Sequence, residues 1–262
     1  MKIAQYTLGS FQTTKSLFRD EEKFLEAFKT GRELKWAEHD ANLFEGGDRF
    51  FGPNYKANLV SLWIPALADE RVEEKLKKGG AIVADVGYGH GTSTIVMAKA
   101  YPNSKFIGFD NHHESIERAT KIAKEEGLSE HQIKFEVTSS TDYPSSNNGV
   151  YDLIAFFDSF YDMGDPMGAA AYALKALKQD GTVMLVEPFA NNNLDDNLNP
   201  LGRMWYAASS MICVLSSMAS NGPALGAQAG EAKIAEVMKV AGFKHFKRAA
   251  QTPINFVYEA RL

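Results

Sequence analysis

Cysteine is almost absent from this chain of 262 residues, which has Cys213 as its single example. An intramolecular disulfide framework and a cysteine-based metal centre are therefore excluded. Positive charge is also scarce, because 28 Lys and Arg face 33 Asp and Glu, for a net charge of −5. Nucleic-acid binding needs a clustered positive face, so we expect no nucleic-acid partner.

Long apolar runs are missing as well. The opening MKIAQYTLGSFQTTK lacks the apolar core of a signal peptide. The most apolar long segment, Met204–Ala219, contains four serines and is short for a membrane span. We therefore expect a cytoplasmic protein without a membrane partner. Hydrophobic residues still make up 45% of the chain, enough for a full core in one large domain.

The stretch from Ala81 to Asp110 is the part around which the rest is organised. Ala81–Val86 is a short apolar run, typical of a strand buried on both faces of a parallel sheet. A glycine-rich turn follows, then a predicted helix at Thr92–Tyr101 and a second strand at Lys105–Asp110. Glycines alternate through the turn, which lets the backbone bend sharply and lets a ligand approach it closely: Gly87, Gly89 and Gly91.

This strand–helix–strand unit predicts a ligand site. Small molecules bind at the carboxyl ends of strands in open α/β sheets. Asp110 ends the second strand, where its carboxylate can accept hydrogen bonds from both hydroxyls of a ribose. The dinucleotide pattern G-x-G-x-x-G would need a glycine at Thr92, so a nicotinamide dehydrogenase is disfavoured. A tight strand–helix turn without a ligand stays open as the alternative.

The observed pattern, D-x-G-x-G-x-G from Asp85 to Gly91, resembles motif I of the class I S-adenosylmethionine-dependent methyltransferases. The resemblance implies S-adenosylmethionine as the cofactor, with the loop backbone against its methionine part and Asp110 at its ribose. At the end of the third strand, where the family often has an Asp for the adenine amino group, this chain has Ser139–Thr141, with Asp142 further on. The implied cofactor-binding residues are Asp85, Gly87, Tyr88, Gly89, Gly91, Thr92, Asp110, Asn111, His112, Ser139, Ser140, Thr141, Phe157 and Asp158.

The chain after Asp110 continues to alternate strands and helices. Further strands are predicted at Ile133–Thr138, Tyr151–Asp158, Thr182–Glu187, Phe243–Ala250 and Ile254–Leu262. Helices are predicted at Glu114–Glu126, Pro166–Lys178, Leu201–Ala219 and Glu231–Ala241. This order resembles the class I methyltransferase fold, which implies an α/β, Rossmann-like, seven-stranded sheet of order 3-2-1-4-5-7-6 with the last strand antiparallel. Residues 189–229 form a helical insert after the fifth strand of that fold.

Residues 1–78 are expected to form a helical, aromatic extension ahead of a methyltransferase domain at 79–262. One helix carries Phe24, Leu25 and Phe28 and ends at Gly31. Ala57–Lys78 is a second predicted helix, kinked or restarted at Pro65. The aromatic segment between them is expected to be broken into turns by Gly46, Gly47, Gly52 and Pro53. It either packs against the main domain or forms a lid over the cofactor.

The segment FFDSFYDMGDP, from Phe156 to Pro166, resembles a loop of small-molecule O-methyltransferases. That loop reads aromatic, His, Asp, Trp, variable, Asp, and in several of those enzymes the His is the general base. Tyr161 stands at the matching position, and a side-chain pKa of about 10 makes it a poor base at neutral pH. Tyr161 either hydrogen-bonds the nucleophile or serves only as a pocket wall. Asp158, at the end of the fourth strand, is the other catalytic candidate.

DANLFEGGDRFF, DMGDP, VEPF and DNLNPLGRMWYAASS together resemble bacterial methyltransferase-domain proteins that usually carry a winged helix ahead of the catalytic domain. This sequence begins near the point where such a winged helix would end. We predict methyl transfer to a small-molecule substrate; a non-catalytic regulator that binds S-adenosylmethionine is the alternative. No catalytic metal is expected, because the histidines lack His-x₃-His spacing and Glu187-Pro188 stands where the metal-dependent branch has an Asp-Asn pair.

The walls of the substrate pocket are expected from segments that the minimal fold lacks. These are Phe44–Phe51 and Arg203–Met211, which we predict to close over the cofactor and to face Asp158 and Tyr161. The predicted substrate-binding residues are Phe44, Phe50, Phe51, Tyr161, Arg203, Trp205 and Tyr206. The alternative for the second segment is burial in a homodimer interface, since its small residues would permit that too.

Overall fold

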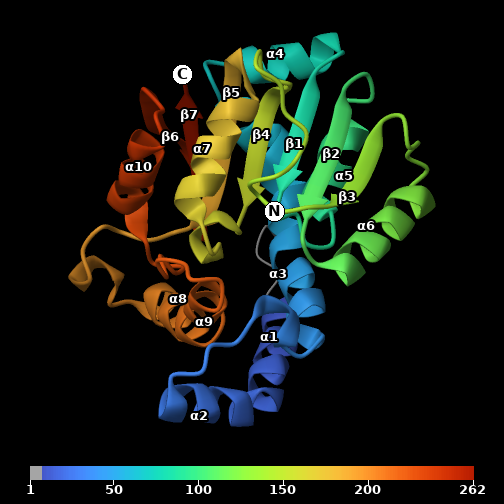
Figure 1. Ribbon diagram of the computed structural model, residues 1–262. Helices are drawn as coiled ribbons and strands as arrows, with labels where there is room; N and C mark the ends of the chain where they lie inside the picture. The colour runs from blue at the N-terminus through green and yellow to red at the C-terminus, as the bar shows by residue number, and fades with distance from the viewer. Residues whose placement is uncertain (1–7) are drawn as a thin grey trace.

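The computed structural model describes residues 8–262 and centres on a seven-stranded sheet of order β3-β2-β1-β4-β5-β7-β6 (Figure 1). The strands are β1 (Ile82–Val86), β2 (Lys105–Asp110), β3 (Ile133–Val137), β4 (Tyr151–Phe157), β5 (Leu177–Pro188), β6 (His245–Gln251) and β7 (Asn255–Arg261). The pairs from β3 through β5 are parallel, whereas β7 is antiparallel to both β5 and β6. The predicted sheet order and the antiparallel last strand are confirmed.

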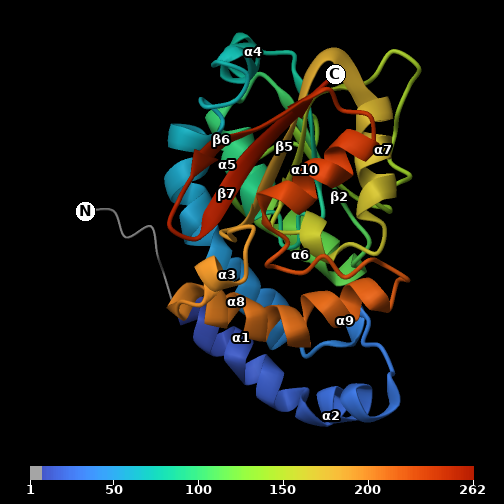
Figure 2. The same ribbon diagram turned by 90° about the vertical axis from the view of Figure 1, so that its left-hand side faces the viewer.

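Helices cover both faces of this sheet (Figure 2). One face packs against α4 (Arg71–Lys78), α5 (Thr92–Ala100) and α6 (His113–Glu125), and the other against α7 (Pro166–Ala176) and α10 (Gly230–Val240). The central strand β4 is buried over most of its length, as a strand covered on both faces must be. Each face therefore has its own apolar core, and both leave the carboxyl ends of the strands free for a site.

Five further helices form a layer below the carboxyl ends of the parallel strands, which we call the helical cover (Figure 1). It consists of α1 (Leu8–Arg19), α2 (Glu21–Thr30), α3 (Asn42–Asn58), α8 (Pro200–Met211) and α9 (Cys213–Met218). The cover thus joins an N-terminal segment to the insert after β5. The end of α2 at Gly31, which has a left-handed φ of 72°, agrees with the sequence prediction.

The expectation that glycine and proline break the aromatic segment into turns is wrong, because α3 runs without interruption through Gly46, Gly47, Gly52 and Pro53. Two glycines instead allow α1 and α3 to pack closely. A Cβ on Gly46 would stand 2.6 Å from the backbone nitrogen of Thr13, and one on Gly9 would stand 2.3 Å from that of Phe50. Helix contacts this close exclude any side chain at these positions, and packing outweighs the weak helix propensity of glycine.

The predicted helix at Ala57–Lys78 is also only partly right. The chain continues from α3 into a π-helical turn at Leu59–Trp63 and restarts as α4 only at Arg71. Three consecutive residues between these elements have positive φ, namely Ala68, Asp69 and Glu70. The Ala68 N–H donates to the buried carboxylate of Glu259 at 2.6 Å, which ties this turn to β7. Helix propensity alone could not predict that distant partner.

Two other predicted helices have different ends. Leu201–Ala219 is two helices, α8 and α9, because Ile212 leaves helical geometry at φ −117° and ψ −73°. The break lets Ile212 and Cys213 join one apolar cluster with Leu43 and Trp205. Pro166–Lys178 ends as a helix at Ala176, whose carbonyl accepts the Val150 N–H at 2.7 Å, and β5 begins at once.

Short 3₁₀ turns complete the described chain, at Trp36–Glu38, Phe160–Asp162 and Asp195–Asn197. The turn at Phe160–Asp162 follows β4 directly and so places Tyr161 and Asp162 at the sheet edge beneath the helical cover. None of the helices found between residues 8 and 262 is long and apolar enough to cross a membrane.

Candidate functional site

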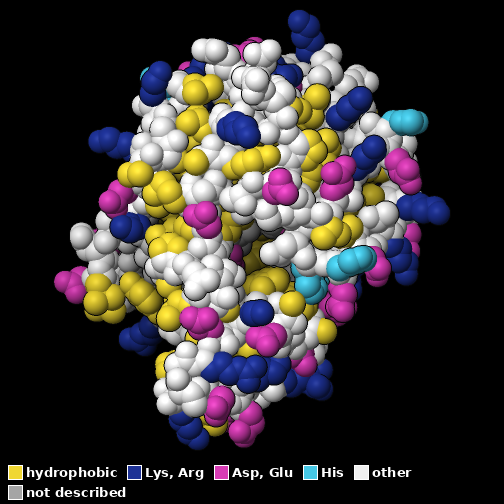
Figure 3. Space-filling view, viewed as in Figure 1, with side chains coloured by type: hydrophobic (Ala, Val, Ile, Leu, Met, Phe, Trp, Pro, Cys, Tyr) yellow, Lys and Arg dark blue, Asp and Glu magenta, His cyan; other side chains and the backbone are white. Residues whose placement is uncertain are grey.

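A cavity of about 610 Å³ lies between the carboxyl ends of the strands and the helical cover. In the space-filling view it opens as a hollow with hydrophobic side chains inside it (Figure 3). Its strand-end half is formed by the Gly87–Gly89 turn, Asp110 and Asn111. Its other half, which we call the helical half, is lined by Trp36, Leu43, Phe44, Phe50, Phe51, Tyr55, Met204, Trp205, Met211 and Ile212.

The strand-end half presents backbone and one carboxylate. Gly89 lines the cavity with φ +55°, and a Cβ placed on it would meet no atom of residues 8–262 within 4 Å, so there is open space beside the loop. Its N–H donates to Asp110 Oδ2 at 3.0 Å, and the His112 N–H donates to Asp110 Oδ1 at 2.9 Å. Burial raises the pKa of Asp110, and these two amides partly oppose the shift. The amides hold the carboxylate in place while it borders the cavity.

Asp85 supports this loop from below. Its side chain is fully buried, and the hydroxyls of Ser93 and Thr94 both donate to its Oδ2 at 2.7 Å. Burial raises the pKa of Asp85 to about 7, against the lowering effect of the two hydroxyls. Asp85 does not line the cavity, so its contacts tie β1 to the start of α5 and fix the glycine turn between them.

The structure divides the predicted cofactor-binding residues into two groups. Those that line the cavity are Gly87, Tyr88, Gly89, Thr92, Asp110, Asn111, Ser140, Phe157 and Asp158. Those that do not line it are Asp85, Gly91, His112, Ser139 and Thr141. A Cβ on Gly91 would stand 2.9 Å from that of Ala119, so this glycine serves the packing of the loop on α6.

Asp158 sits at the junction of three elements. It has a left-handed φ of 48°, which is strained for a residue other than glycine. Tyr55 of α3 donates to its Oδ2 at 2.8 Å, and Asn255 of β7 donates to its Oδ1 at 2.7 Å. Asn54 donates in turn to Asn255 Oδ1 at 2.7 Å. Burial raises the pKa of Asp158 to about 7, and its two hydrogen bonds oppose that shift.

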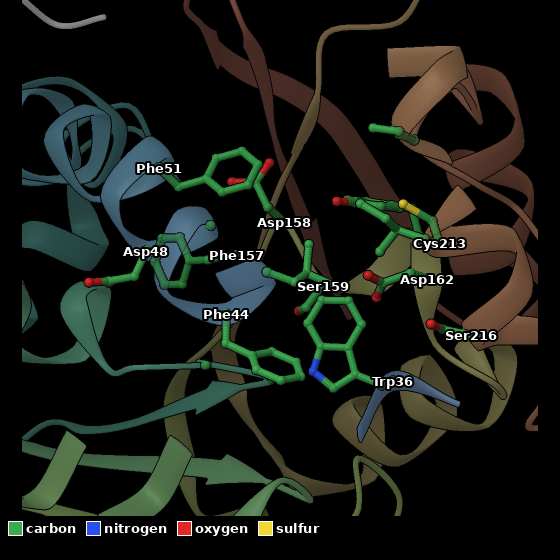
Figure 4. Close-up of a pocket in the computed structure, with 18 of the residues that line it drawn as sticks. Trp36, Phe44, Asp48, Phe51, Phe157, Asp158, Ser159, Asp162, Cys213 and Ser216 are labelled. Carbon is green, nitrogen blue, oxygen red and sulfur yellow. The ribbon is translucent and has the colours of Figure 1, made fainter. Parts of the chain in front are cut away.

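Asp162 also faces the cavity, near Asp158 and Ser159 (Figure 4). Within residues 8–262 its carboxylate has no side-chain hydrogen bond or ion pair, unlike that of Asp158. Burial, reinforced by the negative charge of Asp158, holds the pKa of Asp162 well above its usual range. Glu187, at the end of β5, is a third buried carboxyl whose pKa burial raises in the same way.

Tyr161 borders the same cavity from the turn after β4. Burial raises the pKa of its phenol above the ordinary value, so the hydroxyl keeps its proton at any physiological pH. The pKa of the Cys213 thiol is raised by burial too, which leaves it a poor nucleophile.

In the helical half, Phe44, Phe50, Phe51 and Trp205 all line the cavity together with Tyr161. The rings of Phe51 and Trp205 lie parallel, at an interplanar angle of 3° and with centroids 6.2 Å apart. Arg203 is exposed and Tyr206 half-buried, and neither lines the cavity. The sequence segments Phe44–Phe51 and Arg203–Met211 therefore do meet around one space, through only some of their predicted residues.

Several cavity residues were not predicted from the sequence. They are Trp36, Tyr55, Asp162 and Ser216, with Asn255 as an outer partner of Asp158. Asp162 had a usable signal, because it follows Tyr161 directly in FYDMGDP. Trp36 and Tyr55 belong to the aromatic segment before Ala57, for which a lid over the cofactor was one of the two interpretations. Ser216 and Asn255 are far away in the sequence from the motifs they join, and no local pattern marks them.

The ionisable side chains that line the cavity are mostly acidic. Asp48, Asp110, Asp158 and Asp162 line it, and among the described residues no Lys or Arg does. His90 lines it as well, with a pKa lowered by burial. No group of three or more His, Cys, Asp or Glu side chains in the described part of the chain is arranged to hold a metal ion.

The family model described as "Methyltransferase domain" matches residues 77–242, and the chain belongs to this family. The matched range contains the glycine turn, Asp110, Asp158 and Asp162. No curated protein matches the chain.

Solved structures with the same fold extend over nearly the whole chain. A proposed O-methyltransferase from Nostoc punctiforme is 18% identical with TM-score 0.63, over 97% of this chain and 72% of that one. An O-methyltransferase family protein from Burkholderia thailandensis is 14% identical with TM-score 0.68, over 95% and 70%. Human N-acetylserotonin methyltransferase in complex with SAM is 18% identical with TM-score 0.58, over 95% and 69%. At these identities they show a shared fold, which includes the helical cover.

Proposed function

We propose that this chain transfers the methyl group of S-adenosylmethionine to a small, apolar or partly aromatic molecule that carries a hydroxyl or amine. The observation that carries the proposal is that one cavity joins the glycine turn and Asp110 to an aromatic chamber containing two aspartates. Family membership and the O-methyltransferases among the structural neighbours support it.

The strand-end half fits this cofactor. The open space beside Gly89 admits a ligand against the backbone, and the Asp110 carboxylate, fixed by two amides, can accept hydrogen bonds from ribose hydroxyls. Asn111 and Ser140 border the part expected for adenine. The bound cofactor supplies an electrophilic methyl group on a positively charged sulfur. The excess of carboxylates over cations around the cavity is compatible with that charge.

The chain's own residues align the substrate and exclude water. Alignment matters most for a methyl transfer, because the nucleophile must approach in line with the bond that breaks. The aromatic walls of the helical half supply a dry surface against which a flat molecule can pack. Asp158, held by Tyr55 and Asn255, fixes α3 over the end of β4.

Asp162 is the residue we propose to receive the substrate's proton. Its carboxylate faces the cavity and has no competing side-chain donor, whereas both oxygens of Asp158 are engaged. Its raised pKa makes the ionised form a stronger base than an ordinary Asp. The ionised Asp162 carboxylate would accept the proton of the substrate oxygen or nitrogen as that atom gains the methyl group, and the electron pair of the broken methyl–sulfur bond would stay on sulfur. Tyr161, which keeps its own proton, forms part of the wall.

The direct test is to incubate the protein with S-adenosylmethionine and a panel of small aromatic alcohols and amines, and to measure S-adenosylhomocysteine formation. Turnover of at least one compound, lost when Asp162 is replaced by Asn, is the expected result. Micromolar cofactor binding by calorimetry without turnover of any compound would instead favour the regulator. Absence of cofactor binding would refute both.

The predicted partners and location rest on the sequence and stay predictions. They are a small-molecule substrate, no nucleic acid, no membrane and a cytoplasmic location, with a homodimer interface as the alternative to the lid for Arg203–Met211. A gel-shift experiment at low salt tests the second of them, with no binding to duplex DNA above a weak background expected.

A further inference from the structure

A second polar chain reaches the cavity from the helical cover, far from the glycine turn. His39 is buried with its Nδ1 3.3 Å from Asp20 Oδ2 and its Nε2 3.5 Å from Ser216 Oγ. Asp20, His39 and Ser216 are all at most 6% exposed. Ser216, on α9, lines the cavity, and its hydroxyl oxygen points toward Asp162 and Trp36 (Figure 4). The chain therefore ends at the substrate side of the cavity.

The direction of the hydrogen bonds in this chain follows from Asp20. Its carboxylate accepts from Lys23 Nζ at 2.6 Å and from the Asp40 N–H at 2.8 Å, so it acts as an acceptor throughout. The Nδ1 of His39 must then carry the proton that faces Asp20. Burial against Phe24 and Trp36 lowers the pKa of His39, which favours the neutral ring. In a neutral ring with its proton on Nδ1, Nε2 is unprotonated.

An unprotonated Nε2 can only accept a hydrogen bond. The Ser216 hydroxyl therefore donates its one proton to His39, and its oxygen lone pairs are left for the cavity. A serine without such a partner can rotate its hydroxyl and serve as donor or acceptor. Here the histidine fixes the serine as an acceptor.

We infer that Ser216 is a specificity-determining residue that accepts a hydrogen bond from a hydroxyl or amine of the substrate, with His39 and Asp20 as its positioning residues. This inference deepens the proposed function, on which it rests. It assigns the substrate a polar donor group that lies under α9, and it disfavours compounds that offer only a carbonyl or ether there. The low exposure of Ser216 and His39 strengthens that discrimination, because a substrate acceptor placed against the serine oxygen leaves two lone pairs facing each other with little access to water.

The same residue types can activate a serine nucleophile, but the surroundings of Ser216 do not suit that role. Ser216 lies within a helix, and its own N–H already donates a hydrogen bond to the Ile212 carbonyl at 3.0 Å. A nucleophilic serine needs free N–H groups beside it to stabilise the developing oxyanion. Recognition rather than covalent attack is therefore the role that the geometry supports.

The test compares two probes that share a naphthalene ring, 2-naphthol, whose hydroxyl can donate, and 2-acetylnaphthalene, whose carbonyl can only accept. Binding is measured by calorimetry with and without saturating S-adenosylhomocysteine. The unchanged protein should bind 2-naphthol about fivefold more tightly, the value of one neutral hydrogen bond. Ser216→Ala should remove the preference. Ser220→Ala makes the same change at another serine that lines the cavity, one with no hydrogen bond to a histidine in the described part of the chain, and should keep the preference.

Asp20→Ala gives a second test, because it removes the acceptor that holds the ring proton of His39 on Nδ1. The ring can then carry its proton on Nε2 and donate to Ser216, so the preference for 2-naphthol should shrink. Nitrogen NMR of the ligand-free protein reads the two tautomers directly, with Nδ1–H expected in the unchanged protein and a larger share of Nε2–H in the variant.

These measurements need no methyl transfer, so they separate this inference from the proposed function. A protein that shows no turnover but retains the probe preference and the Nδ1–H tautomer supports the Ser216 assignment and contradicts the enzyme proposal. Equal discrimination by the unchanged protein and Ser216→Ala, or an Nε2–H tautomer in the unchanged protein, would overturn the assignment.

Discussion

The two halves of the cavity are built on different principles. The strand-end half consists of backbone at the glycine turn and of Asp110, all contributed by consecutive elements of one strand–helix–strand unit. The helical half consists mainly of large side chains from α3 and α8, with Trp36 and Ile212, which come together only because two distant segments share one layer. The first half can recognise a fixed cofactor with few side chains. The second can change its shape through single substitutions without disturbing the sheet.

If that division is correct, the largest effect should come from the proposed base. Asp162→Asn should lower kcat by about 10²–10⁴-fold, the usual worth of a general base. Cofactor affinity should stay within about twofold, because Asp162 lies outside the glycine turn. In the unchanged protein the rate should rise with pH through the raised pKa of Asp162, since only the ionised carboxylate accepts a proton. Steady-state kinetics over pH would check both, and a variant with an unchanged pH profile would exclude Asp162 as the base.

The next largest effect should appear in the strand-end half. Gly89→Val should weaken S-adenosylhomocysteine binding by about hundredfold or more, because the branched side chain fills the open space and strains a position with φ +55°. Gly31→Val is the matched control, at φ +72° with open space but at the end of α2, far from the glycine turn. Calorimetry should find normal affinity for the control; equal losses in the two variants would mean that strain, not the ligand space, is responsible.

Asp110→Ala should have a smaller effect on the same half. Loss of charge-assisted hydrogen bonds to the ribose should weaken S-adenosylhomocysteine binding by about 1.5–3 kcal/mol, or roughly 10–150-fold. Asp142→Ala removes an exposed carboxylate from the loop after β3 and should leave affinity unchanged. Unchanged calorimetric affinity in Asp110→Ala would remove Asp110 from the ribose site.

The same division explains what could be predicted from the sequence. The positions of the seven strands along the chain, the glycine turn and the acid at the end of β2 are local patterns, and each was predicted from neighbouring residues. The order of the strands in the sheet was implied by the resemblance to the class I methyltransferase fold. The helical half was predicted only in outline. Gly46 was interpreted as a turn residue, although its real role is close contact with Thr13 on another helix. A glycine has the same local signature in both roles.

Hydrogen-bond partners that lie far apart in the sequence could not be predicted for a related reason. Asp158 and Asn255 are 97 residues apart, and His39 and Ser216 are 177 apart. A hydrogen bond across such a separation has no periodicity or motif, because it depends on how the cover is set over the sheet. Asp162 is the exception that the sequence could have supplied, since it adjoins Tyr161 in the loop already singled out.

The smallest effect we predict tests the hydrogen bond between Tyr55 and Asp158, which links α3 to the end of β4. Tyr55→Phe removes the hydroxyl that donates to Asp158 at 2.8 Å. Burial raises the folded-state pKa of Asp158 to about 7, so the folded protein holds this proton more tightly than the unfolded chain does. The stability that Asp158 contributes is therefore full below about pH 4 and is lost as pH rises through about 7.

Tyr55 lessens that loss, because its hydrogen bond is stronger to the ionised carboxylate than to the neutral acid. Tyr55→Phe should therefore lower the free energy of unfolding by about 1 kcal/mol at pH 5 and by about 2 kcal/mol at pH 8. Tyr143→Phe removes a buried hydroxyl that has no hydrogen-bond partner among residues 8–262; it is the control and should show no such dependence on pH. Urea unfolding at the two pH values measures both variants. If the two Tyr→Phe changes cost the same amount at both pH values, Tyr55 does not stabilise the ionised Asp158, and α3 is held over the sheet by its other contacts, such as the hydrogen bond from Asn54 to Asn255.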